Sequence, residues 1–329
     1  MKKTERIITW TMFIVIFAGL MVWASFSDLQ ISKNIAALKP GEYYSTNTFA
    51  RAIEIFGEIP LYLFLCFSFA VIFWNGFYFG KNNSKPLICV FALLACVACA
   101  LFVPVRIHSY FSKFKEAIFD ETEVQGGAAY VVFVLVVGAA LTMLSLAGAS
   151  MAGKQKMRKL LAFAVVVLFV AAFSQLFTQG VKTFTQRVRY RALNSMSSDE
   201  FFTPWYIFNG KGKFESVIGL PGFGKDSVRS FPSGHTTAAG ITYTLVALPF
   251  LFNRLNDFWG KFVVFFVALA YTGMVAYARI LMGAHYLSDV VIGGSVSFLF
   301  TLIAIEILFV RKKIKPLADF CDEAEEAEE

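Results

Sequence analysis

The sequence predicts an all-α fold, a polytopic bundle of transmembrane helices, and three observations lead to this class. Hydrophobic residues make up 57% of the 329-residue chain, and only 16% of its residues are charged. Its mean hydropathy is +0.62. The apolar residues form uninterrupted runs of about 20, the length with which a helix crosses a hydrocarbon core of roughly 30 Å. Strands of a barrel would instead appear as short alternating segments.

About eight spans follow from these runs. In chain order they are residues 7–26, 53–80, 86–107, 129–150, 160–181, 233–252, 262–280 and 288–310. The first run is too long for the apolar region of a signal peptide and lacks a convincing cleavage site, so we expect it to remain as a helix. We divide the chain into four N-terminal spans (1–153), a region with four further spans (154–315) and an acidic cytoplasmic tail (316–329).

Lysine and arginine are dense in the short connections on one side of the membrane. They occur near residues 2–6, 81–85, 154–159, 254–261 and 311–315. Because positive charge in short loops marks the cytoplasmic side, we expect both termini in the cytoplasm of a multi-pass protein of the cell membrane. The extracytoplasmic face then holds residues 27–52, 108–128, 182–232 and 281–287.

The net charge of +7 does not indicate a nucleic-acid partner, because no basic stripe interleaved with aromatic residues lies outside the membrane-flanking loops. The five cysteines form no disulfide framework. Cys96 and Cys99 have metal-like spacing, but no second ligand pair is near them in the sequence, so we interpret them as helix packing.

Two polar or aromatic features have two interpretations each. Glu54 and Glu58 lie one helical turn apart near the outer end of the second span, where a substrate role and an ion pair are both reasonable. The outer loop 197–229 contains the aromatic run 201–206. This run would serve either as an anchor at the level of the lipid headgroups or as a lid over one headgroup.

The first motif with chemical potential begins where the fifth span ends. Lys182 and Arg189 are seven residues apart, so they share one face if the helix continues for two more turns. Basic flanks belong on the cytoplasmic side, whereas this pair falls on the opposite one. The spacing therefore predicts two cations directed toward one point.

The second motif is the stretch 230–236, Ser-Phe-Pro-Ser-Gly-His-Thr, which opens the sixth span. The N–H groups around Ser233 and Gly234 would face an anion above the helix start, and His235 adds a titratable imidazole. Ser233 and His235 do not face each other on a helix and no nucleophile elbow is present, so we discount a serine hydrolase. The stretch predicts a phosphate cradle.

The third motif joins the last two spans. Arg279 closes the seventh span, Gly283 permits a sharp turn, and His285 and Asp289 stand four apart at the start of the eighth. On a helix this spacing lets the carboxylate bind one imidazole nitrogen and leaves the other free to react. The three motifs fall on the same predicted face of the membrane.

In this order and around the last four spans, K-x6-R, P-S-G-H and R-x5-H-x3-D resemble the type 2 phosphatidic acid phosphatase superfamily. The motifs cover residues 182–289, and the similar helix layout extends from about 154 to 311. Two departures are Tyr190, where the family usually has Pro, and Ala278, where a serine often precedes the arginine. The family core has six helices, so either the first or the second predicted hairpin is additional.

The resemblance implies a role for each matching residue. His285 would be the nucleophile that forms a phosphohistidine, Asp289 would orient it, and His235 would act as general acid and base. The phosphate oxygens would be held by Lys182, Arg189, Ser233, Gly234 and Arg279. No metal and no cofactor is implied, because cationic side chains would take the place of magnesium.

The expected function is that of an integral-membrane lipid phosphatase, a phosphoric ester hydrolase with a lipid phosphate substrate among the membrane lipids. The substrate stays open between phosphatidic acid, phosphatidylglycerol phosphate and a polyprenyl pyrophosphate, and so does the oligomeric state. A lipid phosphotransferase with the same site is one alternative, and a non-catalytic lipid binder or transporter is another. A vanadate-dependent haloperoxidase is disfavoured, since those enzymes are typically soluble.

Overall fold

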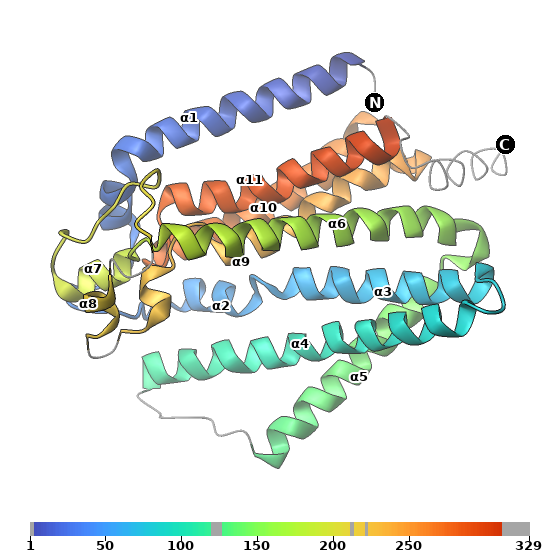
Figure 1. Cartoon of the computed structure of the whole chain (residues 1–329), viewed down its shortest axis with the longest axis horizontal. Helices are drawn as coiled ribbons and strands as arrows, with labels where there is room; N and C mark the ends of the chain where they lie inside the picture. Colours follow the sequence, from blue (N-terminus) through green and yellow to red (C-terminus); the bar gives the residue numbers. More distant parts are fainter. Residues whose placement is uncertain (1–2, 120–126, 211–213, 221–222, 311–329) are drawn as a thin grey trace. The chain divides into compact units, whose positions relative to one another are not determined.

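The computed structural model describes residues 3–119, 127–210, 214–220 and 223–310, and these residues form helices and loops without a β-strand (Figure 1). The α-helices are α1 (Lys3–Ile35), α2 (Thr48–Phe56), α3 (Ile59–Phe79), α4 (Lys85–Phe119), α5 (Ala128–Ser150), α6 (Gly153–Thr185), α7 (Tyr190–Met196), α8 (Glu215–Ile218), α9 (Gly234–Ala239), α10 (Phe258–Leu281) and α11 (Leu287–Ile305). The 3₁₀ helices are η1 (Lys225–Val228), η2 (Gly240–Phe250) and η3 (Asn253–Leu255), and a π-helical turn, η4 (Glu306–Val310), follows α11.

The predicted all-α polytopic class is confirmed, because seven helices in the described part of the chain are long and apolar enough to cross a membrane. They correspond to seven of the eight predicted spans. The predicted span 233–252 is instead the six-residue helix α9 followed by the 11-residue 3₁₀ helix η2. A 3₁₀ helix rises about 2.0 Å per residue and an α-helix about 1.5 Å, so this segment covers a given thickness with fewer residues. The predicted tail 316–329 lies outside the described residues.

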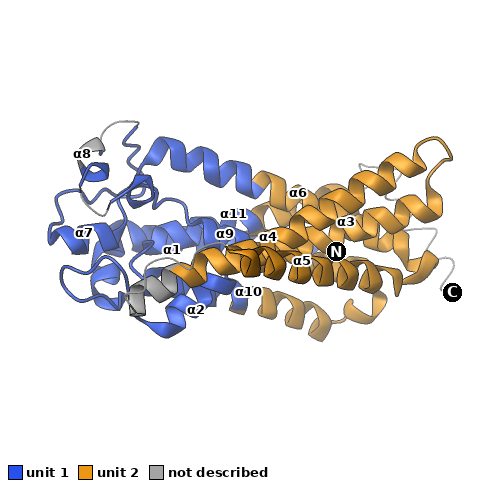
Figure 2. Ribbon diagram, turned by 90° about the horizontal axis from the view of Figure 1, so that it is seen from below, with its two compact units in different colours: residues 1–57, 174–240, 271–297 blue, residues 58–173, 241–270, 298–329 orange. Residues whose placement is uncertain are grey.

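The chain forms two compact units, and each combines segments distant in sequence (Figure 2). Unit 1 contains Met1–Gly57, Ser174–Gly240 and Tyr271–Ser297. Unit 2 contains Glu58–Phe173, Ile241–Ala270 and Phe298–Glu329. Every residue of the three sequence motifs belongs to unit 1.

Small side chains allow the helices of unit 2 to approach closely. Its buried core includes Cys66 and Ala70 of α3, Cys96 and Ala100 of α4, and Ala149 of α5. Helices in lipid associate through such close packing, because burying apolar surface gives no advantage over contact with lipid tails. The predicted packing role of Cys96 agrees with this position, since its sulfur lies 3.5 Å from that of Cys66.

Loops connect the helices of unit 1 through backbone and amide hydrogen bonds. The Ala37 N–H donates to the carbonyl oxygen of Leu281 at the end of α10. The Asn194 side chain donates to the carbonyl oxygens of Lys39 and Glu42, both at 2.8 Å. Because these loop carbonyls are satisfied by other segments of unit 1, the loops between α1 and α2 and around α7 have a defined course.

The turn between α10 and α11 depends on Gly283, whose φ is +62°. A Cβ at this position would lie 2.6 Å from Leu38 Cδ1 and 3.2 Å from Tyr190 Cδ1. Both the left-handed backbone and the lack of space therefore require glycine. The predicted sharp turn is confirmed, and it places His285 two residues later between the helices.

We expect Gly283→Ala to lower both thermal stability and activity, because the new methyl group strains the backbone and displaces Leu38. Gly273→Ala is the matched control. Gly273 lies within α10, and a Cβ there would meet no atom within 4 Å. Alanine is the better helix former, so this control should unfold at the wild-type temperature or slightly above it. Equal unfolding temperatures of the two variants in detergent would contradict the role of Gly283.

Candidate active site

His285 is buried in the turn before α11, with 1% of its surface exposed. Its Nε2 lies 3.3 Å from Arg189 Nη1, and its Nδ1 lies 3.5 Å from Asp289 Oδ2. A guanidinium group only donates hydrogen bonds, so Nε2 must accept and the ring proton belongs on Nδ1, facing the carboxylate. This tautomer leaves the lone pair of His285 on the nitrogen that faces the arginine.

The electrostatic surroundings keep this imidazole neutral. His285 lies in the loop between α10 and α11, outside the helices that could span a membrane. Burial holds the pKa of His285 well below its usual value of 6.5, and the charges of Arg189, Arg279 and Lys182 lower it further. A neutral imidazole keeps a lone pair on one ring nitrogen, so His285 is held in the protonation state that a nucleophile would need.

Asp289 is fully buried and has a donor for each carboxylate oxygen. Arg187 Nη1 donates to Oδ1 at 2.7 Å. Oδ2 accepts from the Tyr286 N–H at 2.9 Å and from the hydroxyl of Ser230. These donors satisfy the carboxylate and fix its orientation toward His285 Nδ1.

Arg189 reaches the site by a different route from the one that the sequence predicts. The expectation that α6 continues to this residue is wrong, because the helix ends at Thr185 and Gln186 adopts a φ of +40°. Arg189 instead precedes α7 and binds Asp226 through both its Nε, to the backbone oxygen, and its Nη2, to Oδ1. Arg189 is therefore positioned by a turn after α6 and by its bonds to Asp226, and not by a helix face that it shares with Lys182.

Asp226, in η1, is a counterion that the sequence analysis did not single out. Its Oδ1 lies 2.7 Å from Arg189 Nη2 and its Oδ2 lies 2.8 Å from Arg191 Nη2. Partial burial disfavours the charged carboxylate, but the positive charges of Arg189 and Arg191 outweigh this effect and lower the pKa of Asp226. Asp226 therefore stays ionised and holds both guanidinium groups in place.

Lys182 lies in the last turn of α6, and its amine is next to Gly234 at the start of α9, so the first motif contacts the second. A Cβ on Gly234 would be 3.3 Å from Lys182 Nζ, so a larger residue at 234 would crowd the amine. The Lys182 amine and the Gly234 N–H have no hydrogen-bond partner among the described residues. A cation and a backbone donor at one helix start suit a phosphate oxygen.

Ser233 and His235 flank that glycine. The Ser233 hydroxyl caps α9 by accepting from the Thr236 N–H, and its own N–H donates to the Asp289 carbonyl oxygen at 2.9 Å. Ser233 thus connects the second motif to the third. His235 lies in the first turn of α9 with 8% exposure, and its ring is adjacent to Gly57 at the end of α2.

Arg279 has a carboxylate partner from outside the three motifs. Its Nη1 donates to Glu54 Oε1 at 2.8 Å, and the other oxygen of Glu54 accepts from Arg51 at 3.0 Å. The Nε of Arg279 is buried and has no hydrogen-bond partner in the described part of the chain. Glu54 therefore balances the charge of Arg279 while its Nε–H remains available for an anion.

The structure distinguishes the two interpretations of the acidic pair in the second span. Glu54 forms the buried ion pairs described above, and Glu58 binds Arg106. Each carboxylate thus has a cationic partner within its own unit. The ion-pair interpretation holds for both residues.

The aromatic run 201–206 packs beside the third motif. The rings of Phe202 and Tyr286 are 5.5 Å apart in an edge-to-face arrangement. Trp205 donates to the Ser25 hydroxyl of α1 at 3.0 Å and stacks on Phe231. The rings of Phe202 and Trp205 therefore pack within unit 1, whereas the side chain of Tyr206 is exposed.

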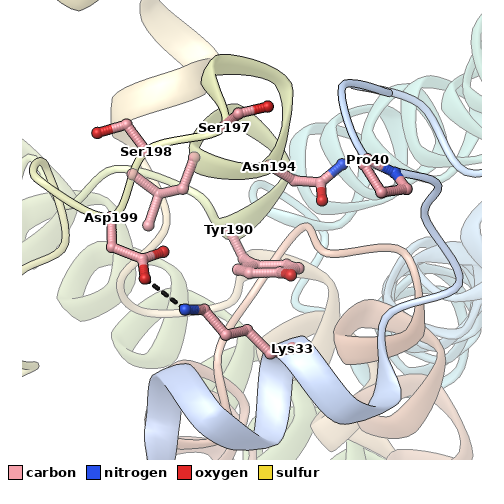
Figure 3. Close-up of a pocket in the computed structure, with 8 residues that line it drawn as sticks. Lys33, Pro40, Tyr190, Asn194, Ser197, Ser198 and Asp199 are labelled. Atoms are coloured by element: carbon pink, nitrogen blue, oxygen red, sulfur yellow. Dashed lines mark hydrogen bonds and ion pairs between the residues drawn. The ribbon is translucent and has the colours of Figure 1, made fainter.

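A surface pocket with a volume of about 300 Å³ lies beside α7 (Figure 3). Its lining residues are Lys33, Pro40, Tyr190, Leu193, Asn194, Ser197, Ser198 and Asp199. The amine of Lys33 binds the carboxylate of Asp199 across this pocket, as Figure 3 shows. No residue of the three motifs lines it, so it is distinct from the histidine site.

Several charged residues that pair with or surround the predicted side chains were not identified from the sequence. They are Asp28, Arg51, Arg187, Arg191 and Asp226. The bond from Ser230 of the second motif to Asp289 was not predicted either. The one available signal was the excess of arginine in the outer segment 187–191, which requires carboxylates nearby if it is buried.

The described residues form a helical protein of the polytopic membrane class in which buried cationic side chains surround a neutral histidine. Residues 163–313 match the family model of the PAP2 superfamily, so this part of the chain is a PAP2 superfamily domain. The resemblance predicted from the three motifs is confirmed, and at family level it assigns phosphatase-type chemistry on phosphoesters. No curated protein and no solved structure matched the chain.

We expect Glu54→Gln to destabilise the protein by on the order of 3 kcal/mol, because it leaves Arg51 and Arg279 buried without their carboxylate. Glu58→Gln is the matched control. Its partner Arg106 has 34% of its side chain exposed, so water compensates for the lost carboxylate. Thermal unfolding in detergent measures both variants. The same unfolding temperature for both would contradict the importance of the Glu54 ion pairs.

We also expect His285 to make folding sensitive to acid. Its pKa is low in the folded protein and ordinary in the unfolded chain, so its contribution is complete above pH 6.5 and is lost as the pH falls below that value. The loss reaches about 1.4 kcal/mol per pH unit. Between pH 7 and pH 5, the unfolding temperature of His285→Gln should therefore decrease less than that of the wild type. Parallel decreases would show that His285 is not buried in neutral form.

Proposed function

We propose that the protein is an integral-membrane phosphatase that hydrolyses a phosphomonoester or pyrophosphate on a lipid headgroup. The observation that carries this proposal is the geometry of His285, with a lone pair on Nε2 facing Arg189 and a carboxylate behind Nδ1. A reactive imidazole beside a phosphate-binding cation is the arrangement that a phosphohistidine mechanism needs.

In the first step, His285 Nε2 attacks phosphorus, the N–P bond forms and the bond to the leaving oxygen breaks. The phosphoryl group then takes the place of the present contact between Nε2 and Arg189 Nη1, so this guanidinium group faces a phosphate oxygen. His235 gives its proton to the leaving alcohol or phosphate. Asp289 stabilises the positive charge that develops on the ring of His285.

In the second step, His235 removes a proton from water and the resulting hydroxide attacks phosphorus. The N–P bond breaks, and inorganic phosphate leaves with His285 neutral again. Lys182, Arg279 and the Gly234 N–H would hold the phosphate oxygens as charge shifts between them. Such fixed donors reduce the reorganisation that water would need.

The proposed reaction needs no added metal, because the positive charge comes from Lys182, Arg189 and Arg279. Among the described residues, no group of three or more His, Cys, Asp and Glu side chains could hold a metal ion. Phosphate release in the presence of a chelator tests this part of the proposal. The lipids to compare are phosphatidic acid, phosphatidylglycerol phosphate and a polyprenyl pyrophosphate.

The proposed topology has the site on the extracytoplasmic face and both termini in the cytoplasm. The density of lysine and arginine in the short connections supports this orientation. Single-cysteine labelling in intact cells, in a variant without the native cysteines, tests it at Glu42 and Asn83.

We expect His285→Gln to abolish phosphate release, because no other described group could form the covalent intermediate at this position. His235→Ala should lose about 10²- to 10⁴-fold in turnover of a lipid phosphate, the usual contribution of a general acid and base. With p-nitrophenyl phosphate, whose leaving group needs no proton, His235→Ala should retain the first step and accumulate labelled phosphoenzyme. Full activity of His285→Gln would refute the mechanism.

Product analysis in the same assay separates hydrolysis from transfer to a second lipid. Free phosphate as the product identifies a hydrolase, and a new phosphorylated lipid identifies a phosphotransferase. A binder or transporter would show neither product and would still bind lipid when both His235 and His285 are replaced.

A further inference from the structure

We propose that Asp28 and Arg187 are positioning residues that set the charge and orientation of Asp289 behind the nucleophile. This inference rests on the proposed function, because it concerns how His285 is prepared for phosphoryl transfer. Asp28 lies outside the three motifs, and Arg187 occupies one of the unspecified positions of the first motif. Asp28 lies on α1, outside the matched residues 163–313.

Arg187 is held in a single orientation. Only 1% of it is exposed, and its Nε donates to the Thr203 carbonyl oxygen at 2.7 Å. Nη1 donates to Ser288 Oγ at 2.8 Å and to Asp289 Oδ1 at 2.7 Å, and Nη2 donates to Asp28 Oδ2 at 3.0 Å. Every nitrogen of the guanidinium group therefore has a protein partner, and these four bonds fix its position.

Aromatic rings fix the plane of the same guanidinium group. Its central carbon lies 4.0 Å from the ring centroid of Tyr286 and 5.4 Å from that of Phe202. Arginine stacks on aromatic faces and forks toward two acceptors at once, which lysine cannot do. This position requires the shape of arginine as well as its charge.

Asp28 is the third charged group of this cluster, after Arg187 and Asp289. It has 4% exposure, its Oδ1 accepts from the Ser288 N–H at 2.9 Å, and its Oδ2 accepts from Arg187 and from the Ser288 hydroxyl. A buried carboxylate is costly unless its oxygens are satisfied, and here they are. Asp28 thus binds both Arg187 and the start of α11, one residue before Asp289.

The net charge of Asp28, Arg187 and Asp289 together bears on catalysis at His285. Arg187 and Asp289 alone would be neutral together, and Arg187 would draw electron density away from the carboxylate that supports His285. With Asp28 the three groups sum to one negative charge. In a buried site this charge is weakly screened and stabilises the positive ring that forms as His285 bonds phosphorus. Asp28 would therefore act on the transition state through Arg187 and Asp289 and would not touch the substrate.

If Asp28 and Arg187 had a purely structural role, they would only hold α1 against the start of α11. The two roles differ in what they do to kinetics. A loss of transition-state charge stabilisation lowers kcat and leaves KM unchanged, whereas general loosening lowers stability and disturbs binding as well. The two roles also differ in the effect of a second substitution. If the charge matters, removing Arg187 together with Asp28 restores part of the lost kcat, whereas a purely structural role predicts no such recovery.

The experiment compares three full-length variants in detergent with the wild type: Asp28→Asn, Asp28→Asn/Arg187→Gln and the control Glu58→Gln. The control removes a carboxylate whose partner, Arg106, belongs to unit 2. We expect Asp28→Asn to lower kcat about tenfold or more at unchanged KM, which corresponds to about 1.4 kcal/mol in the barrier. Glu58→Gln should retain the wild-type kcat.

The double variant decides between charge and structure. Of the three groups Asp28, Arg187 and Asp289, the double variant keeps a charge on Asp289 alone. Its kcat should therefore exceed that of Asp28→Asn, although the double variant has lost more hydrogen bonds. If Asp28→Asn does not fold, the test rests on the double variant alone. The double variant has no buried cation without its carboxylate at this position, so we expect it to fold with a kcat within about tenfold of wild type. A folded double variant as inactive as His285→Gln would overturn the inference, as would Asp28→Asn with the kcat of the control.

The same assay separates this inference from the proposed function. A wild-type protein that releases no phosphate from any lipid tested would refute the proposed function itself. An active wild type together with an equally active Asp28→Asn would refute only the role of Asp28 and Arg187.

Discussion

The carboxylate of Asp289 is the constraint on which the rest of unit 1 depends. A buried carboxylate without donors would cost several kcal/mol, so the chain must bring donors to both of its oxygens. They come from the segment after α6, from the stretch before α9 and from the start of α11, through Arg187, Ser230 and the Tyr286 N–H. The same contacts join the three motifs. The contacts that satisfy this buried charge are therefore also the contacts that assemble the proposed phosphate site.

The cations near His285 present the opposite difficulty, because they repel one another. Three carboxylates pair with four arginines of unit 1: Asp28 with Arg187, Glu54 with Arg279, and Asp226 with both Arg189 and Arg191. Lys182 has no such partner among the described residues. Its charge, with the free Nε of Arg279 and the Gly234 N–H, is what remains for an anion. The cations are thus held in place by counterions before substrate arrives, as preorganised catalysis requires.

Sequence patterns predicted the parts of this site that recur at fixed spacing and left out the parts that depend on three-dimensional contact. Apolar runs of the right length predicted the helices, and three motifs predicted where His285, Asp289 and the cations lie in the chain. The helix expected to carry Lys182 and Arg189 on one face ends between them, because the backbone at Gln186 turns into the left-handed region. Asp28 gave no signal, since a single aspartate at a helix end is usually exposed and nothing local indicates that it pairs with a residue 159 positions away.

The counterions also show that helices before the matched residues 163–313 contribute to unit 1. Helix α1 supplies Asp28 and α2 supplies Glu54, both to arginines of unit 1. Helices α3, α4 and α5 lie wholly within unit 2. A buried arginine without its carboxylate is costly, so Arg187 and Arg279 depend on charges that the first two spans supply. The matched part of the chain therefore relies on the N-terminal part for two of its counterions.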